Sequence, residues 1–192
     1  MTQMGFYYDA KKCSGCRACQ IACKDRNDLP VGALYRHVLS CETGTYPHPS
    51  GYNYSKTCNH CSEPQCVNNC PTGAMYKAED GTIRHDDDRC IGCKMCVMSC
   101  PYNVPVYLEE KGITGKCDSC AHIRELGGNP VCVDACCMRA LEFGDIEELK
   151  KAHEGSAPPD IALFPSSEMT KPNTLIHSKE SMHDKDFTIV SL

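Results

Sequence analysis

Residues 90–101 read CIGCKMCVMSCP. This stretch places Cys90, Cys93, Cys96 and Cys100 on one short loop, with a proline directly after the last cysteine. Similar groups occur three more times, so that the chain carries four cysteine motifs. In chain order they are motif I (Cys13, Cys16, Cys19, Cys23), motif II (Cys58, Cys61, Cys66, Cys70), motif III (the quoted stretch) and motif IV (Cys117, Cys120, Cys132, Cys136). Of the 18 cysteines, only Cys41 and Cys137 lie outside these motifs.

Three kinds of structure use cysteines at this density. A disulfide framework is typical of secreted chains with an even cysteine count, but three sulfurs on one tight loop would mispair. A zinc ribbon takes two sulfurs from each of two loops, and motifs I and III offer three plus one. The run C-x2-C-x2-C-x3-C-P is the ferredoxin arrangement for 4Fe–4S clusters, in which the fourth cysteine ligates the other cluster of a pair. We therefore predict iron–sulfur clusters in preference to zinc or disulfides.

The composition agrees with a fold that depends on cofactors. The chain has 192 residues, no Trp and only 4 Phe, so it is short of large core-forming side chains. A net charge of −5 argues against nucleic acid as a partner. No apolar run reaches the roughly 18–20 residues that span a bilayer, and the first residues lack the features of a signal peptide. We expect a chain that is soluble or held at a membrane by partners.

The segment between motifs II and III predicts a β-hairpin. A short apolar strand is followed by an Asp80-Gly81 turn and a second strand over 82–85. This hairpin brings motifs II and III together as one dicluster module and leaves motifs I and IV for the other. We expect an α+β fold over 1–145, with an inner module (52–105) inserted in an outer one (1–51 and 106–145). A strand over 138–144 and a short helix over 145–153, capped by Asp145, follow motif IV.

From residue 155 the chain has no cysteine, four prolines and little helical periodicity. A disordered tail is one interpretation. Its apolar residues, however, favour an arm that lies extended on a partner, so that residues 146–192 form the short helix and this C-terminal arm. The apolar residues are Ile161, Leu163, Phe164, Leu175 and Ile176.

Several other residues are candidates for supporting roles. Buried clusters need N–H groups and cations around them, and the nearby glycines and basic residues are candidates. They are Gly15, Gly92, Arg17, Lys94, Lys116 and Arg139. His60 is predicted to form a hydrogen bond and not to act as a ligand, and Cys41 and Cys137 are predicted to be small apolar fillers.

No P-loop, dinucleotide fingerprint or nucleophile elbow occurs, so we expect no catalytic residue. A chain with several clusters and no substrate site conducts electrons. The alternative to a subunit of a larger complex is a free polyferredoxin, a diffusing carrier without a fixed partner.

The motifs resemble the iron–sulfur subunits of the dimethyl sulfoxide reductase family of molybdopterin oxidoreductases. The resemblance is carried by CNHCSEPQCVNNCPTGAM, DDRCIGCKMCVMSCPYNVP, KCDSC, RALEFG and TKPN, and it extends to about residue 177. It implies four 4Fe–4S clusters, because Cys93 stands where nitrate reductase relatives have a Trp. The ligand sets that it implies are a first quartet (Cys13, Cys16, Cys19, Cys136), a second (Cys23, Cys117, Cys120, Cys132), a third (Cys58, Cys61, Cys66, Cys100) and a fourth (Cys70, Cys90, Cys93, Cys96).

The resemblance also implies partners and a location. It implies a catalytic subunit that carries bis(molybdopterin guanine dinucleotide), and usually a membrane anchor that oxidises menaquinol. We expect the complex on the extracytoplasmic face of the cytoplasmic membrane, with the cytoplasm as the alternative. The substrate of the catalytic subunit does not follow from an electron-transfer chain.

Overall fold

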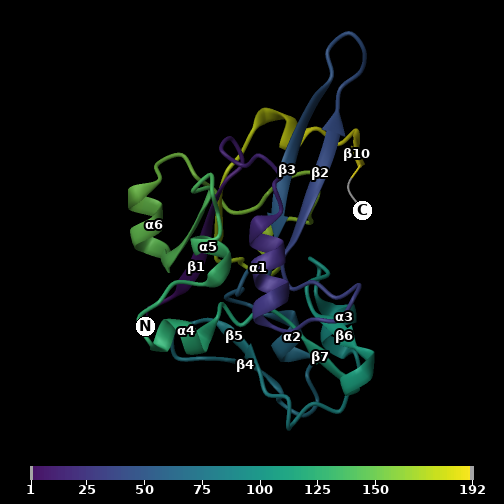
Figure 1. Ribbon diagram of the computed structural model, residues 1–192, viewed down its shortest axis with the longest axis vertical. Helices are drawn as coiled ribbons and strands as arrows, with labels where there is room; N and C mark the ends of the chain where they lie inside the picture. Colours follow the sequence, from purple (N-terminus) through teal and green to yellow (C-terminus); the bar gives the residue numbers. More distant parts are fainter. Residues whose placement is uncertain (1, 191–192) are drawn as a thin grey trace.

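The structure is a computed structural model that describes residues 2–190, and it consists of small sheets joined by short helices, an α+β arrangement as expected (Figure 1). In chain order the elements are β1 (Met4–Asp9), α1 (Ala18–Arg26), β2 (His37–Thr43), β3 (Ser50–Lys56), α2 (Gln65–Asn68), β4 (Met75–Lys77), β5 (Ile83–His85), α3 (Met95–Ser99), β6 (Val106–Leu108), η1 (Glu109–Lys111), β7 (Ile113–Gly115), α4 (Ala121–Glu125), α5 (Val131–Asp134), β8 (Leu141–Asp145), α6 (Ile146–Ala152), η2 (Ser167–Met169), β9 (Thr174–His177), η3 (Glu180–His183) and β10 (Phe187–Ile189). Within residues 2–190, no helix is long and apolar enough to cross a membrane.

A three-stranded sheet joins three parts of the chain that are distant in sequence. Its strand order is β8-β1-β9, with β1 antiparallel to β8 and parallel to β9. Side chains alternate between the two faces of a strand, so Phe6 and Tyr8 enter the main core while Tyr7 faces the other way. Tyr7 packs with Ile146 and Leu149 of α6, so this helix covers the second face. The sheet thereby holds the start of motif I next to the end of motif IV.

The elements predicted after motif IV are present. The strand expected over 138–144 is β8, and the helix expected over 145–153 is α6. Asp145 caps the helix, because its Oδ1 accepts hydrogen bonds from the N–H groups of Glu147 (2.9 Å) and Glu148 (3.2 Å). The capping spacing in the sequence is confirmed as the start of a helix.

The hairpin predicted between motifs II and III is also confirmed, as the antiparallel pair β4–β5. Asp80 shapes its turn by accepting hydrogen bonds from the N–H (3.0 Å) and the hydroxyl (2.6 Å) of Thr82. The same carboxylate pairs with Arg124 of α4 at 2.8 Å. The turn between motifs II and III is therefore tied to motif IV. In Figure 1 this hairpin lies in the lower part of the molecule with α2, α3, β6 and β7.

The C-terminal segment differs from the expected arm, because it returns to its own chain. β9 extends the sheet of β1, and β10 pairs antiparallel with β2. Ile161, Ile176 and Met182 are buried in the main core, and Leu175 is buried under α6. The physical reason is the shortage of core side chains elsewhere in the chain, which the apolar residues of this segment supply. Their hydrophobicity is accounted for without a partner.

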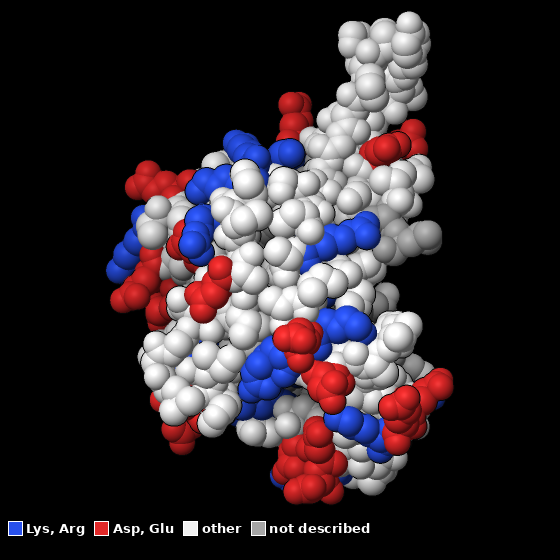
Figure 2. Space-filling view, in the orientation of Figure 1, with Lys and Arg blue, Asp and Glu red and all other residues white. Residues whose placement is uncertain are grey.

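The hairpin β2–β3 projects from the body of the molecule (Figure 1). The expected boundary of the inner module at residue 52 lies within β3. Residues 44–50, at the tip, contain no Lys, Arg, Asp or Glu, and Figure 2 shows this projection as an uncharged surface. At its base the hairpin contributes Val38, Cys41, Tyr52 and Tyr54 to the main core.

Candidate iron–sulfur cluster sites

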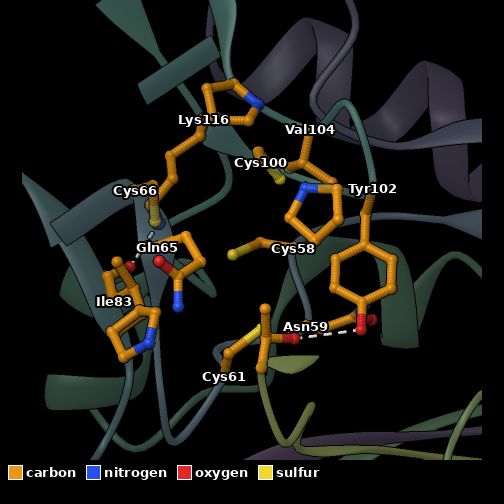
Figure 3. Close-up of a pocket in the computed structure, with 14 residues that line it drawn as sticks. Cys58, Asn59, Cys61, Gln65, Cys66, Ile83, Cys100, Tyr102, Val104 and Lys116 are labelled. Atoms are coloured by element: carbon orange, nitrogen blue, oxygen red, sulfur yellow. Dashed lines mark hydrogen bonds between the residues drawn. The ribbon is translucent and has the colours of Figure 1, made fainter. Parts of the chain in front are cut away.

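The third quartet lines one cavity. Cys58, Cys61 and Cys66 come from motif II, while Cys100 comes from motif III, and all four sulfurs face the same space (Figure 3). The rest of the wall is mostly apolar and includes Pro64, Ile83, Pro101, Tyr102, Val104 and Pro105. An apolar wall keeps water from the sulfurs, as a buried cluster requires. The structure thus brings together the four cysteines that the resemblance grouped.

The first quartet lines a second cavity. Cys13, Cys16 and Cys19 belong to motif I, and Cys136 belongs to motif IV, more than a hundred residues later in the chain. Tyr8, Val38, Ala140 and Leu141 form the apolar part of the wall. This site is built as the third one is, with three sulfurs from one motif and one from another.

The second quartet is the most deeply buried of the four, since Cys23, Cys117, Cys120 and Cys132 are all buried. Burial raises the pKa of Cys23, and the nearby Cys117, Cys132 and Cys120 raise it further. Burial likewise raises the pKa of Cys132 to about 11. Such interactions need the sulfurs to be close together. The packing of α1, which carries Cys23, against α5, which carries Cys132, brings the end of motif I to motif IV.

In the fourth quartet, Cys96 lies close to Cys70 and Cys90. Burial raises the pKa of Cys96, and these two cysteines add to the rise. Burial opposes ionisation of Cys70 too, but the N–H of Met75, which donates to its Sγ at 3.4 Å, lowers its pKa overall. Cys93, on the same loop as Cys90, is exposed.

Two pairs of helices explain how cysteines from different motifs meet. α1 packs against α5, and α2 packs against α3. α1 carries Cys19 and Cys23, while α5 carries Cys132 and is followed by Cys136. Each helix of a pair carries or precedes cysteines of two quartets and so contributes to both sites. The pair α2–α3 repeats this arrangement, with Cys66, Cys70, Cys96 and Cys100 in or directly after the two helices.

The loops before these helices share an unusual backbone conformation. Gly15 and Arg17 in motif I have φ of 74° and 63°, and Gly92 and Lys94 in motif III have φ of 65° and 62°. Alternating left-handed residues of this kind turn backbone N–H groups toward the inside of a loop, where they stabilise negative charge. A glycine adopts this conformation without the strain that a side chain adds. The motif that repeats in the sequence thus forms the same loop conformation twice in the structure, with backbone N–H groups turned inward.

Backbone N–H groups already donate to several of the sulfurs. Ala140 donates to Cys136 Sγ at 3.2 Å, and Ser119 donates to Cys117 Sγ at 3.3 Å. Hydrogen bonds of this kind stabilise a thiolate over a thiol. These sulfurs are prepared to carry the negative charge of a ligand.

The donor sets fit 4Fe–4S clusters better than single metal ions. Among residues 2–190, no three His, Cys, Asp or Glu side chains converge closely enough to bind one ion. In the two cavities, four sulfurs instead surround a space with apolar walls. A tetrahedral zinc site needs its four sulfurs at about 2.3 Å from one point, whereas a cluster occupies the space between them. In the described part of the protein every cysteine is a free thiol, so the disulfide alternative is not supported.

The predicted supporting cations differ in their surroundings. Lys116 is buried and lines the third-quartet cavity, where its Nζ donates hydrogen bonds to the carbonyls of Ile83 and Cys117. Arg17 lines the first-quartet cavity. Lys94 lies over the ring of Tyr107, with Nζ 3.8 Å from the centroid, and Arg139 is exposed. Of these four cations, Lys116 is the one that is both buried and part of a cavity wall that contains the cysteines of a quartet.

Arg36 is a further candidate that the sequence motifs do not reveal, and it is 1% exposed. Its Nη1 donates to the Oγ (2.9 Å) and the carbonyl (3.3 Å) of Ser55. Burial would lower the pKa of a guanidinium, but nearby cysteines, led by Cys132 and Cys19, raise the pKa of Arg36 overall. The residue therefore remains a cation between sulfurs of two quartets. Its position between motifs I and II gives no signal, because no cysteine lies near it in the sequence.

The other residues singled out in the sequence have structural partners. His60 is fully buried, and its Nδ1 accepts a hydrogen bond from the N–H of Ile83 at 2.9 Å, as expected for a residue that is not a ligand. Cys41 is buried in the main core, as predicted. Cys137 is exposed instead of filling a core position, because it lies beside the exposed Cys16.

The four quartets form a row with exposed ends. Cys19 of the first quartet influences Cys132 of the second, and Cys58 of the third influences Cys117 of the second. Each terminal quartet includes an exposed cysteine, Cys16 in the first and Cys93 in the fourth. The second quartet is buried and the third partly buried, while each end of the row has an accessible cysteine, which suits entry and exit of electrons at opposite ends.

Comparison with known families supports this description of the sites. A family model for a "4Fe-4S dicluster domain" matches residues 50–146, and a "4Fe-4S binding domain" model matches residues 10–28. These two ranges contain all four motifs.

Several curated proteins are similar over most of the sequence. The B subunit of anaerobic dimethyl sulfoxide reductase from Escherichia coli (strain K12) is 43% identical over 183 residues, covering 91% of this chain and 88% of that protein. The same subunit from Haemophilus influenzae is 40% identical over 92% of this chain and 89% of that protein. The thiosulfate reductase electron transfer subunit PhsB of Salmonella typhi is 38% identical over 73% of this chain and 75% of that protein. The protein therefore belongs to the family of iron–sulfur electron-transfer subunits that includes the B subunit of dimethyl sulfoxide reductase.

Proposed function

We propose that this protein holds four 4Fe–4S clusters and passes electrons between a redox partner and a molybdopterin catalytic subunit. The redox partner is a quinol-oxidising membrane anchor or another donor. The protein itself has no catalytic role. The ligands are the four quartets, shared between an inner module over 52–105 and an outer module formed by 1–51 and 106–145.

One observation carries this proposal furthest: four cysteines from motifs II and III line a single cavity. The same construction recurs for motifs I and IV, where Cys136 completes the set of Cys13, Cys16 and Cys19. Apart from the cysteines, much of each lining is apolar, including Pro64, Ile83 and Val104 in one cavity and Val38, Ala140 and Leu141 in the other. The sites are suited to binding a cofactor and not to converting a substrate.

The residues around the sites supply what such a cofactor needs. When bound, a 4Fe–4S cluster provides a one-electron couple with a net negative charge once its four thiolates are counted. N–H groups such as those of Met75 and Ala140 offset part of this charge at the sulfurs. Lys116 and Arg36 offset more of it from buried positions. Apolar walls exclude water, which limits the reorganisation that accompanies a change of charge.

The partners are inferred from the relatives. Their names identify a B subunit of dimethyl sulfoxide reductase and an electron transfer subunit of thiosulfate reductase, both of which serve enzymes with several subunits. We infer that this protein likewise docks on a catalytic subunit through one exposed end of the row. We further propose, from the resemblance of the motifs alone, that the complex lies on the extracytoplasmic face of the cytoplasmic membrane.

Anaerobic purification of the full-length protein from its native source tests the proposal. The preparation should be brown, contain about sixteen iron atoms per chain, and copurify with a molybdenum-containing subunit. About four zinc ions with little iron would contradict the cofactor assignment. A protein with its full iron content that purifies without any other subunit would instead be a free polyferredoxin.

A further inference from the structure

Arg36 is the one arginine among the described residues whose side chain is nearly inaccessible to solvent, at 1% exposure. It precedes β2 at the base of the projecting hairpin. Its guanidinium lies over the ring of Phe6, with Cζ 4.7 Å from the centroid. No carboxylate forms a salt bridge with it within residues 2–190. A buried cation is stable only when a negative charge compensates it.

The compensating groups are the cysteines of two different quartets. Cys132, Cys117 and Cys23 belong to the second quartet, and Cys19 belongs to the first, and all four favour the charged form of Arg36. The ring of Phe6, over which Arg36 lies, belongs to the core cluster that contains Cys19 of the first quartet and Cys117 and Cys132 of the second, so Arg36 lies near both sites.

A hydroxyl group connects Arg36 to the first quartet. Arg36 Nη1 donates to Ser55 Oγ at 2.9 Å, and this oxygen lies 3.4 Å from Cys19 Sγ. Ser55 can thus accept from the guanidinium while its own O–H donates to the sulfur. A donor polarised in this way stabilises negative charge on Cys19 more strongly than an isolated hydroxyl.

Two further guanidinium nitrogens have no hydrogen-bond partner within residues 2–190. Nε and Nη2 of Arg36 are buried and make no hydrogen bond with any described residue. Buried donors are nearly always satisfied, so these two need acceptors that the protein does not supply. The electron-rich sulfur of a bound cluster is an acceptor of the required charge.

We propose that Arg36 is a shared counter-charge that raises the reduction potentials of the first and second centres together. This inference rests on the proposed function, since it assumes clusters at both quartets. Each reduction adds one electron, and therefore one negative charge, without adding a proton. A fixed positive charge favours the more negative state, so it raises the potential of each centre that it faces. Arg36 acts through the electrostatic field and is a positioning residue, not a catalytic one.

The arrangement has a consequence for electron flow. Because the charge of Arg36 acts on both centres, it shifts their two reduction potentials in the same direction and keeps the difference between these potentials small. A reduced centre carries more negative charge and so disfavours reduction of the centre beside it. The positive charge of Arg36 weakens this effect. The first two steps of the row are thereby matched to each other, while the third and fourth centres are set by other groups, including Lys116 at the third.

The test is a mediated redox titration of the anaerobically purified full-length protein with its copurifying subunits, followed by electron paramagnetic resonance. The variants are Arg36→Met, Arg36→Lys, Ser55→Ala and, as the matched control, Arg139→Met. Arg139 lies three residues after Cys136 but is exposed, so solvent screens its charge. The titration electrode supplies the electrons, and the signals lost in Cys19→Ser and Cys23→Ser identify the first and second centres.

We expect Arg36→Met to lower both of these potentials by at least a tenfold change in the reduction equilibrium, about 59 mV for a one-electron couple. The other two potentials should stay in place. Arg36→Lys, which keeps the charge, should leave both potentials near their wild-type values. Arg139→Met should not change any potential. Ser55→Ala should lower the first potential alone.

Three results would overturn the inference. These are unchanged potentials in Arg36→Met, an equal shift in Arg36→Met and Arg36→Lys, and a shift of all four centres together. If Arg36→Met does not assemble, Ser55→Ala is the deciding variant. An unaltered potential of the first centre in Ser55→Ala would exclude an influence of Arg36 on Cys19 through the Ser55 hydroxyl. A wild-type protein without iron–sulfur signals would instead contradict the proposed function itself, so the two failures are distinguishable.

Discussion

The sulfur atoms of Cys16 and Cys137 lie 3.7 Å apart, although the two residues are 121 positions apart in the chain. Cys16 belongs to the first quartet, and Cys137 directly follows Cys136 of the same quartet. Both thiols are exposed. The N–H of Ala18 is the main influence that lowers the pKa of Cys16, and the hydrogen bond with Cys16 raises the pKa of Cys137. A cysteine that belongs to no quartet therefore lies beside the exposed cysteine of the first quartet.

This proximity predicts that Cys137 can replace Cys16 as a ligand. Cys16→Ser should keep most of its iron, whereas Cys16→Ser combined with Cys137→Ser should lose about four iron atoms per chain, the content of one cluster. Cys13→Ser, which has no such neighbour, is the control and should lose the same amount as the double variant. Iron and acid-labile sulfide per chain measure the effect. Equal losses in the single and double Cys16 variants would show that Cys137 does not substitute.

The cysteine motifs and the elements close to them could be predicted from the sequence, for physical reasons. Cysteine spacing determines which sulfurs can share a loop, and the Asp80-Gly81 turn and the Asp145 cap are local signals that act within a few residues. Arg36 could not be found in this way. Its role depends on the hairpin β2–β3 bringing it to cysteines from motifs I and IV, which is a tertiary arrangement without a local signature.

The position of the C-terminal segment also depends on a tertiary arrangement that has no local signature in the sequence. Its apolar residues are evident in the sequence, but hydrophobicity alone does not say whether a residue is buried in its own chain or in a partner. The parallel pairing of β9 with β1 decides the matter, because it places Ile176 beside Tyr8. Such a pairing joins residues too far apart for any pattern in the sequence to reveal it.

The burial of this segment leads to a stability prediction. Ile176 is 2% exposed, so Ile176→Ala should reduce the free energy of unfolding by about 2–5 kcal/mol. For a protein of this size, that corresponds to a Tm lower by at least about 4 °C in anaerobic thermal unfolding. Ile189→Ala is the matched control, because Ile189 is 46% exposed and its removal should change stability by less than about 0.5 kcal/mol. Equal Tm values for the two variants would mean that the segment is not part of the core.

The loop of motif III leads to a prediction about the fourth site. Gly92 has φ of +65°, and a Cβ added there would lie 2.2 Å from the carbonyl oxygen of Gly112. Gly92→Ala must therefore displace the loop that carries Cys90 and Cys93, and it should selectively weaken the resonance signal of the fourth centre. Gly127→Ala is the control, because Gly127 has φ of +83° but open space around it. It should show only the backbone strain of about 1–2 kcal/mol and keep all signals. An intact fourth-centre signal in Gly92→Ala would contradict the close packing of this loop.

We infer that Cys23 shares its cluster with motif IV and not with its neighbours in motif I, and the nesting of the two modules depends on this. The most direct measurement is potentiometric titration with electron paramagnetic resonance on Cys23→Ser, Cys120→Ser and Cys19→Ser. We expect Cys23→Ser and Cys120→Ser to alter the same redox transition, and Cys19→Ser to alter a different one. The claim would be contradicted if Cys23→Ser and Cys19→Ser altered one common transition and Cys120→Ser another.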